Sequence, residues 1–473
     1  MPLKRHNIDW TQGASRRIPL FQIFVIHRNT SWYFSKMIKS LSGLKSQNLS
    51  GTVQVPGDKS ISHRAVIFGA LSTGETEIHG LLEAEDVLAT AQAVGNMGAS
   101  VQHKGSGHWI IRGLGVGGLQ APAVPLDFGN SGTAARLMMG VVAGHNFEAK
   151  FVGDESLSRR PMARVLEPLH EMGLNWHEEF DHLPLTLLGP ERLMPMEYKL
   201  PVPSAQVKSA ILIAGLFAPG VTSVFETEAT RDHTERMLGY FGAEINVEEK
   251  DGGRLISVKG DAEMAGAPVN VPGDPSSAAF LTAAALICPG SDITIKGVLV
   301  NPTRIGFYQT LKEMGADIVF ENERTESGEP IADVRVKHSQ LTGVDVPAER
   351  APSMIDEYPM LACLAAYAKG TTHMRGLNEL RVKESDRLAA TQAGLKMVSV
   401  SSEIAGDDLI VHGDGTVAGG GFVKTHLDHR IAMSFLVMSL AAQDPIAVDD
   451  TRMIATSFPS FIGLMEGLGA KFK

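Results

Sequence analysis

Cysteine is scarce in this chain: Cys288 and Cys363 are the only two among 473 residues, and each lies in an apolar run. Two separate thiols cannot form a cysteine-rich metal site or a disulfide framework. We therefore interpret both as small buried side chains of a protein from the reducing cytoplasm. Aromatic residues make up only 6% of the chain, which argues against an aromatic platform for nucleic acid.

Long apolar runs and a surplus of positive charge are missing too. No run reaches the roughly 18–20 residues that a membrane-spanning helix needs. The formal net charge is −10, so no basic field attracts the chain to nucleic acid or membranes, and an anion site must be a local pocket. The motifs HExxH, CxxC and the P-loop are absent, so we expect no metal ion, no nucleoside triphosphate and no cofactor.

Residues 1–40 differ from the rest of the chain. The run Ile18–Ile26 lies between arginines and has some character of a signal or transit peptide, but no clear cleavage site comes after it. We expect an N-terminal extension that is disordered or not native, with Met37 as the true first residue, and leave it out of the fold argument.

The stretch Val53–Ala70 contains the pattern around which the rest of the chain is organised. Thr52–Val55 alternates like a strand, residues 56–58 (Pro-Gly-Asp) turn the chain, and a polar head with Lys59, Ser60 and Arg64 opens an apolar helix. The first N–H groups of a helix lack partners and carry partial positive charge, which favours an anion. This start predicts a phosphate or carboxylate site, and the alternative is an ordinary capped helix with solvated charges.

Two segment types alternate along the chain. The first is a polar head followed by an apolar helix, at Lys59–Leu71, Asn130–Ala143, Ser204–Phe217, Asp274–Ile287, Asp356–Ala368 and Asp428–Ala441. The second is an amphipathic helix ending near a capping glycine, at Gly98, Gly173, Gly242, Gly315 and Gly469, with a degraded copy near Lys396. Between them lie short strands such as Thr76–His79, Ser291–Ile295 and Thr371–Met374. The spacing predicts six units of about 75 residues, too long for a common solenoid.

The sequence Val-Pro-Gly-Asp occurs twice, at Val55–Asp58 and Val271–Asp274, and each copy opens an apolar helix. We infer two halves of three units that join at these turns. Helices that are apolar all round should be interior. Their polar N-termini would then meet in a cleft between the halves.

Several other polar heads carry charge without a clear partner. Gly132 lets a ligand approach the backbone or relieves a turn, and Arg136 at helical spacing could be structural. Arg159 and Arg160 precede Pro161, which suits a first helical position. Arginines at a helix start oppose its dipole, so we expect either a bound anion or a nearby acid.

Lys383 and Arg387 stand four residues apart, which on a helix is an unfavourable like-charge pair. Either Asp386 neutralises one charge, or the pair serves an anionic ligand with Glu384 placed for proton transfer. At residues 428–430, Asp-His-Arg suggests acid–base chemistry, with a hydrogen-bonded structural histidine as the alternative.

From about residue 48 to the C-terminus, the chain resembles the 5-enolpyruvylshikimate-3-phosphate synthases, and its form resembles the bacterial group noted for glyphosate-insensitive members. Nine ordered motifs carry the resemblance: PGDKSISHRA, GNSGTAARL, SLSRRPMARVL, PSAQVKSAILIAGL, TRDHTERML, IDEYP, RVKESDR, LDHRIAMSF and TSFP. The resemblance implies a two-domain inside-out α/β barrel, each domain with three βαβαββ repeats around buried helices. We expect residues 58–272 to form one domain, and residues 41–57 plus 273–473 the other.

The resemblance also implies roles for the matching residues. Shikimate 3-phosphate would be bound by Lys59, Ser60, Arg64, Ser204, Ala205, Gln206, Arg231, Asp356 and Lys383. Phosphoenolpyruvate would be enclosed by Lys59, Gly132, Arg160, Gln206, Arg387 and Arg430. Asp356 would be the base at the 5-hydroxyl, with Glu384 and Lys59 handling protons at the phosphoenolpyruvate methylene. We expect a cytoplasmic monomer that binds these substrates and the inhibitor glyphosate, without metal, cofactor, nucleic acid or membrane.

Two residues depart from the pattern. Many relatives have lysine where this chain has Thr456, and insensitive members often have alanine where it has Gly132. We therefore expect glyphosate to compete with phosphoenolpyruvate here.

Two other functions are the alternatives. The related transfer to UDP-N-acetylglucosamine usually needs a loop cysteine, and both cysteines here lie in apolar runs. A repeat scaffold would not explain cations at the helix heads.

Overall fold

The computed structural model describes residues 40–473, so the expectations for the N-terminal extension and Met37 lie outside the described residues. Two hydrophobic cores organise this part of the chain. One takes its residues from Ile61 to Val271, and the other from Leu41, Leu49 and Val55 together with residues 278–470. Among the described helices, none has the length and apolar character that crossing a membrane requires.

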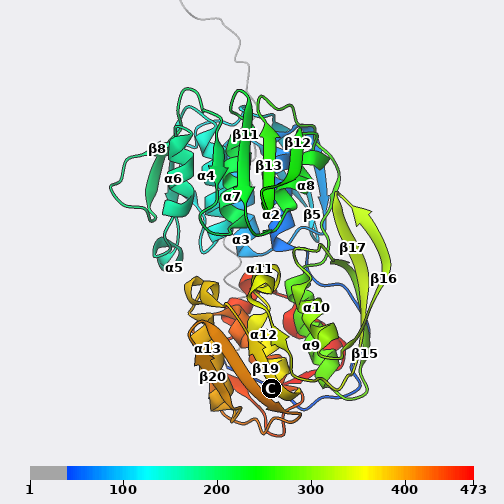
Figure 1. Cartoon of the computed structure of the whole chain (residues 1–473). Coiled ribbons are helices and arrows are strands. Elements are labelled where there is room, and N and C mark those ends of the chain that lie inside the picture. The colour runs from blue at the N-terminus through cyan, green and yellow to red at the C-terminus, as the bar shows by residue number, and fades with distance from the viewer. Residues whose placement is uncertain (1–39) are drawn as a thin grey trace, which may run out of the picture. The chain divides into compact units, whose positions relative to one another are not determined.

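Within residues 40–473, six four-stranded sheets repeat one arrangement, in which an edge strand runs parallel to its neighbour and two antiparallel neighbours come next. Figure 1 shows β11, β13 and β12 of one such sheet side by side. Three sheets accompany the first core, in the orders β14-β3-β5-β4, β6-β7-β9-β8 and β10-β11-β13-β12. Three accompany the second, in the orders β2-β15-β17-β16, β18-β19-β21-β20 and β22-β23-β1-β24. The repetition confirms the expected inside-out α/β fold.

Most of the strands are short, and the longer ones contain several β-branched residues, for example Ile293, Thr294 and Ile295 in β15. Those of the first three sheets are β3 (Thr73–His79), β4 (Ser100–Gly105), β5 (His108–Leu114), β6 (Leu126–Asp127), β7 (Glu148–Val152), β8 (Asn175–Trp176), β9 (Leu185–Leu188), β10 (Glu197–Lys199), β11 (Val221–Glu226), β12 (Ile245–Lys250), β13 (Gly253–Lys259) and β14 (Val269–Asn270). Those of the others are β1 (Leu41–Leu44), β2 (Ser50–Val53), β15 (Asp292–Leu299), β16 (Asp317–Glu326), β17 (Glu329–Lys337), β18 (Asp345–Val346), β19 (Lys369–Met374), β20 (Ser402–Ala405), β21 (Asp408–Asp414), β22 (Phe422–Val423), β23 (Ala447–Val448) and β24 (Lys471–Phe472).

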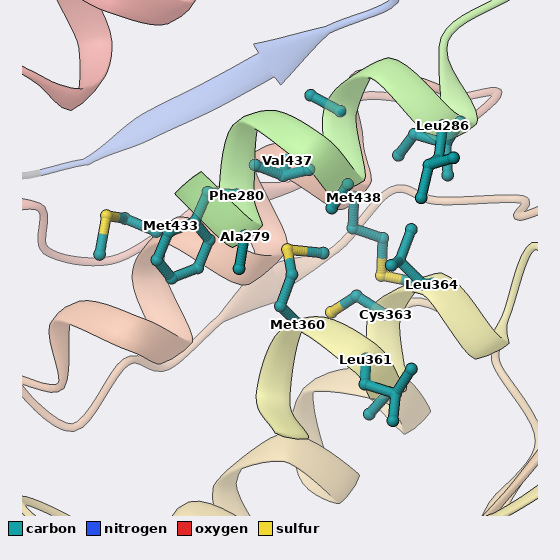
Figure 2. Close-up of a cluster of buried hydrophobic side chains, with 14 of the residues drawn as sticks. Ala279, Phe280, Leu286, Met360, Leu361, Cys363, Leu364, Met433, Val437 and Met438 are labelled. Atoms are coloured by element: carbon teal, nitrogen blue, oxygen red, sulfur yellow. The ribbon is translucent and has the colours of Figure 1, made fainter. Parts of the chain in front are cut away.

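All six apolar helices form where they were predicted. They are α2 (Lys59–Leu71), α4 (Gly132–Ala143), α7 (Ala205–Gly215), α9 (Pro275–Ile287), α12 (Tyr358–Ala365) and α14 (His429–Ser439). Five begin behind a side chain that caps the first turn, from Asp58, Ser131, Ser204, Asp274 or Asp428. Figure 2 shows α9, α12 and α14 packed through Phe280, Met360 and Met438. Their polar N-termini are therefore fixed by buried helix bodies.

The amphipathic helices are α3 (Glu85–Asn96), α6 (Ala163–Glu171), α8 (His233–Tyr240), α10 (Gly306–Glu313), α13 (Arg387–Met397) and α15 (Phe461–Gly467). All five predicted capping glycines have positive φ, for example 99° at Gly98 and 105° at Gly469. In the degraded copy, Ser399 takes this conformation, with φ 62°. The shorter helices are α5 (Glu155–Ser158), α11 (Ala351–Met354), η1 (Ala348–Arg350), η2 (Asn378–Val382) and η3 (Arg452–Thr456).

The two Val-Pro-Gly-Asp copies pair with each other. Gly57 and Gly273 form an antiparallel bridge, and the N–H groups of Asp58 and Asp274 donate to the carbonyls of Pro272 and Pro56 at 2.7 and 2.9 Å. A Cβ on Gly57 would lie 2.0 Å from the backbone oxygen of Gly80, so glycine is required there. The chain thus passes between the two cores at one tightly packed crossing.

Candidate active site

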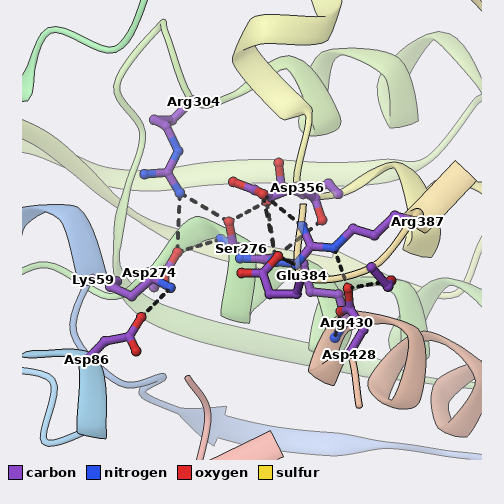
Figure 3. Close-up of polar contacts among 12 residues, drawn as sticks. Lys59, Asp86, Asp274, Ser276, Arg304, Asp356, Glu384, Arg387, Asp428 and Arg430 are labelled. Carbon is purple, nitrogen blue, oxygen red and sulfur yellow. Dashed lines mark hydrogen bonds and ion pairs between the residues drawn. The ribbon is translucent and has the colours of Figure 1, made fainter. Parts of the chain in front are cut away.

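Asp356 lies among three arginines, two of which are labelled in Figure 3. Arg231 donates through Nη2 to Asp356 Oδ2 at 2.7 Å, Arg387 donates through Nη1 to Oδ1 at 3.1 Å, and Arg430 Nε lies 3.9 Å from Oδ1. Burial alone would raise the pKa of this carboxyl, but the surrounding cations, Arg430 foremost, hold it well below its ordinary value. Since Arg231 lies between β11 and α8, Asp356 joins residues of both halves.

Arg387 is held by three carboxylates and is only 1% exposed. Its Nε donates to Asp428 Oδ2 at 2.8 Å, and its Nη2 donates to Glu384. Burial would lower the pKa of Arg387, but these acids raise it above its ordinary value. The side chain is a permanently charged fork of donors, held in this position by its three acid partners.

The prediction that Lys383 and Arg387 share a helical face is wrong. Asp386 caps α13 by accepting from Ala389 N at 3.0 Å, so the helix begins at Arg387. Lys383 and Glu384 precede the helix, after η2. Asp386 therefore caps a helix rather than neutralising Arg387.

Glu384 and Lys59 carry opposite charges and influence each other's pKa. Lys59 Nζ lies 3.2 Å from Asp86 Oδ2 on α3. Burial would lower the pKa of Lys59, but Asp86 and Glu384 raise it. Burial would likewise raise the pKa of Glu384, but Arg387 and further cations, including Lys59 and Arg160, hold it below its ordinary value. Burial also lowers the pKa of Lys383.

The expectation of a helix start at Arg159 and Arg160 is wrong as well. Both come after α5, and α6 begins only at Ala163. The guanidinium of Arg160 instead donates to Asn130 Oδ1 at 2.6 Å, in the loop before α4. A Cβ on Gly132 would lie 3.3 Å from Arg160 Nη1, so the two predicted phosphoenolpyruvate contacts are neighbours.

The Ser204-Ala205-Gln206 head joins this group through a residue whose role the sequence left open. Arg136 Nη1 donates to Gln206 Oε1 at 3.2 Å, and Gln206 Nε2 donates to Thr133 Oγ1 at 3.0 Å. Burial and nearby Arg160 lower the pKa of Arg136 to about 10. Arg136 thus orients a residue that the resemblance assigns to both substrates.

Arg64 lies deeper than its neighbour Ser60. It is 3% exposed and donates to Thr234 Oγ1 at 2.7 Å, to Ser209 Oγ at 2.8 Å and to the backbone oxygen of Ser60 at 3.0 Å. The structure brings Arg64 beneath the first turn of α2, where it supports Ser60.

Sequence reasoning missed a buried relay beside Asp356. Arg304 donates to Asp58 at 2.9 Å, to Asp274 at 3.3 Å and to Ser276 Oγ at 3.1 Å, which ties it to both copies of the crossing. Ser276 Oγ in turn donates to Glu357. The repeated aspartate was a usable signal, whereas Arg304 stands alone in its segment and gave none.

Glu357 ends this relay. Its Oε1 lies 3.8 Å from Arg430 Nη1, and its Oε2 is buried without a hydrogen-bond partner in residues 40–473. Burial and the neighbouring Asp356 raise the pKa of Glu357. Its position directly after Asp356 was the only hint in the sequence.

Two buried histidines at helix starts, His233 of α8 and His429 of α14, are structural in character. His233 Nδ1 pairs with Glu329 Oε1 at 2.8 Å, and Asn301 donates to both Asp232 and Glu329. Burial lowers the pKa of His429 to about 4, so its imidazole is neutral.

Thr456, which stands where many relatives have lysine, donates to the carbonyl of Met453 at 2.7 Å within η3.

Comparisons with known proteins identify the family. The family model described as EPSP synthase (3-phosphoshikimate 1-carboxyvinyltransferase) matches residues 44–465. Proteins named 3-phosphoshikimate 1-carboxyvinyltransferase are 59% identical to this chain in Parvibaculum lavamentivorans, over 92% of this chain and 97% of the relative, and in a Bradyrhizobium strain, over 91% and 98%. The solved EPSP synthase of Acinetobacter baumannii superposes with a TM-score of 0.83 at 43% identity, covering 92% of this chain and 100% of that one. The chain belongs to the EPSP synthase family, the 3-phosphoshikimate 1-carboxyvinyltransferases.

Proposed function

We propose that the cations around Asp356 and Glu384 hold the two anionic substrates of an enolpyruvyl transfer. The reaction moves the enolpyruvyl group of phosphoenolpyruvate to the 5-hydroxyl of shikimate 3-phosphate and releases phosphate, in the shikimate pathway to the aromatic amino acids. The observation that carries the proposal is that Arg231, from one half, and Arg387, from the other, meet on one carboxylate. Two substrates with several negative charges need such a concentration of preorganised cations.

The residues proposed for the two substrates overlap at Lys59 and Gln206. For shikimate 3-phosphate they are Lys59, Ser60, Arg64, Ser204, Ala205, Gln206, Arg231, Asp356 and Lys383. For phosphoenolpyruvate they are Lys59, Gly132, Arg160, Gln206, Arg387 and Arg430. The capped first turns of α2, α4 and α7 add positive potential where the phosphates would lie.

The chemistry needs an acid and a base in one site. Protonation of the phosphoenolpyruvate methylene makes C2 electrophilic, and Lys59 and Glu384 are proposed to handle the protons at this carbon. In the free site Lys59, with its raised pKa, carries the proton, and Glu384, with its lowered pKa, is a carboxylate that can accept one. The 5-hydroxyl then adds while Asp356 takes its proton, and the tetrahedral intermediate loses phosphate and a methyl proton. No covalent adduct with the enzyme is needed.

The arginines tune the proposed base. A carboxylate whose pKa is held low is a weak base, so Asp356 must gain basicity when the substrates arrive. Phosphoenolpyruvate supplies competing negative charge for Arg387 and Arg430. As they turn to the substrate, their hold on Asp356 weakens and its pKa rises.

Glu357 is proposed to position Arg430. Arg304 donates to Ser276, and Ser276 donates to Glu357, so Glu357 is tied to the paired Val-Pro-Gly-Asp turns. Glu357 in turn lies beside Arg430. A buried carboxylate at 3.8 Å limits where the guanidinium can go. Glu357 is therefore a positioning residue and not a contact to substrate.

The finer assignments are proposals as well. Glyphosate is proposed to compete with phosphoenolpyruvate, even though the chain resembles the group with insensitive members, because Gly132 leaves space beside Arg160. A monomer is proposed from the family resemblance, and the two buried free thiols suit a cytoplasmic protein. The composition of the two cores supports domains of residues 58–272 and of 41–57 plus 273–473.

A phosphate-release assay with both substrates tests the proposal. We expect turnover with shikimate 3-phosphate and none with UDP-N-acetylglucosamine as the acceptor. Asp356→Ala should lose about 10²–10⁴-fold in kcat, the usual value of a general base. The control Asp345→Ala removes a carboxylate paired with Arg375 at the surface and should keep normal turnover. Near-normal kcat in Asp356→Ala would refute the role of Asp356.

A further inference from the structure

Two histidines and a glutamate gather on one strand pair of the first half, outside the proposed active site. In the antiparallel pair β3–β5, Ile78 stands opposite Trp109, so the next pair along the ladder is His79 and His108. Glu77 is two residues before His79 and therefore projects from the same face of the sheet. The fold thus places three side chains of metal-binding types, two histidines and one glutamate, side by side.

The donor atoms converge. Glu77 Oε1 lies 2.9 Å from His108 Nε2 and 3.3 Å from His79 Nε2, and the two imidazole rings stack with centroids 4.4 Å apart. One ligand atom from each residue lies within 4.8 Å of the other two. Metal–ligand bonds of about 2.0–2.2 Å in a tetrahedral site separate neighbouring donors by about 3.3 Å. The distances suit a cation, which binds once the two stacked imidazole rings rotate so that both Nε2 lone pairs point to it.

The backbone beneath these side chains is rigid, while the donors themselves are accessible. Ile78, between Glu77 and His79, and Trp109, directly after His108, are 0% and 6% exposed and fix the strands on the core. The side chains of His79, Glu77 and His108 are 50%, 46% and 32% exposed, so an ion can enter and keep water in its remaining position.

We propose that His79, His108 and Glu77 form a binding site for a divalent transition-metal ion such as Zn²⁺. Two imidazole nitrogens and one carboxylate suit Zn²⁺, whereas Mg²⁺ and Ca²⁺ prefer oxygen-only shells. The site lies at the end of β3, where the carbonyl of His79 accepts from Val271 N at 2.8 Å. It therefore adjoins the second copy of the crossing and is separate from the cluster at Asp356.

Zinc titration of the whole chain by isothermal calorimetry tests the site without using activity. We expect the double variant His79→Ala/His108→Ala to bind one equivalent of Zn²⁺ fewer than the parent chain. Glu77→Gln, which keeps the shape of the side chain, should weaken this equivalent by at least about tenfold. A large excess of MgCl₂ should leave it in place.

The matched control is His103→Ala. His103 lies on β4 of the same sheet, and its Nε2 is 2.7 Å from Oε1 of Glu83, in the segment between β3 and α3. This pair has no second imidazole, so its loss should leave the isotherm unchanged. Identical isotherms for the parent and the double variant would overturn the proposal. So would an equal loss in His103→Ala, unchanged binding in Glu77→Gln, or displacement by Mg²⁺.

Discussion

Gly132→Ala is the most informative single change in the proposed phosphoenolpyruvate site. The new methyl carbon would lie 2.7 Å from Arg136 Nη1, 3.3 Å from Arg160 Nη1 and 3.7 Å from Leu157 Cδ1. The first two atoms are ends of flexible side chains, so the methyl group fits if the Arg160 guanidinium gives by a few tenths of an ångström and that of Arg136 moves further. The φ of Gly132 is not in the left-handed region, so alanine is not strained there.

The two anions should respond differently to this shift. Glyphosate has one more atom than phosphoenolpyruvate between its carboxylate carbon and its phosphorus, so it needs more of the space beside Arg160. We expect the inhibition constant of glyphosate to rise at least about tenfold, or about 1.4 kcal/mol. The KM for phosphoenolpyruvate should rise only a few-fold. Stability should not fall, because alanine is favoured over glycine in a helix by about 1 kcal/mol.

Phosphate release at varied phosphoenolpyruvate and glyphosate concentrations measures both constants. Gly463→Ala is the control, because it adds a methyl group to α15 with no described atom within 4 Å. An unchanged inhibition constant in Gly132→Ala, or a KM that rises as much as the inhibition constant, would refute the reasoning.

Three further changes test other parts of the structure. Lys59→Met should lose most turnover while its thermal unfolding midpoint stays normal, because Lys59 makes a partly exposed ion pair, and normal rates would contradict its role in proton transfer. Glu357→Gln should raise the KM for phosphoenolpyruvate more than that for shikimate 3-phosphate, because Arg430 loses its charged neighbour. The control is Asp333→Asn, which changes another mostly buried carboxylate and should alter neither KM. If Glu357→Gln raised both KM values equally, its role would be merely structural. The folded pKa of His429, about 4, lies below its unfolded value of about 6.5, so the unfolded state binds more protons and acid favours unfolding. Urea titrations give the free energy of unfolding at pH 6.5 and at pH 5. Over this interval it should fall by about 2 kcal/mol more in the parent than in His429→Gln, and equal falls would contradict a neutral buried imidazole.

The sequence by itself determined the repeated units. Each apolar helix is visible in the sequence as a run of about a dozen mostly apolar residues. The caps are local too, because Asp58 and Ser131 each accept from a backbone N–H only three residues further on. Gly98 and Gly469 mark helix ends by a conformation that depends on the residue itself. Such local signals need no knowledge of the rest of the chain, which is why α2 begins and ends at its predicted residues.

Only the tertiary structure decided which charges meet. Arg231 and Asp356 are 125 residues apart, and Arg304 reaches Asp58 across 246 residues. No periodicity specifies such pairs, because they depend on how six sheets close around two cores. The same holds for Arg387, whose partners could not be predicted from neighbouring residues. Spacing suggested that it shares a helical face with Lys383. In the structure Asp386 caps the helix, so the helix begins only at Arg387, and the guanidinium reaches Asp356.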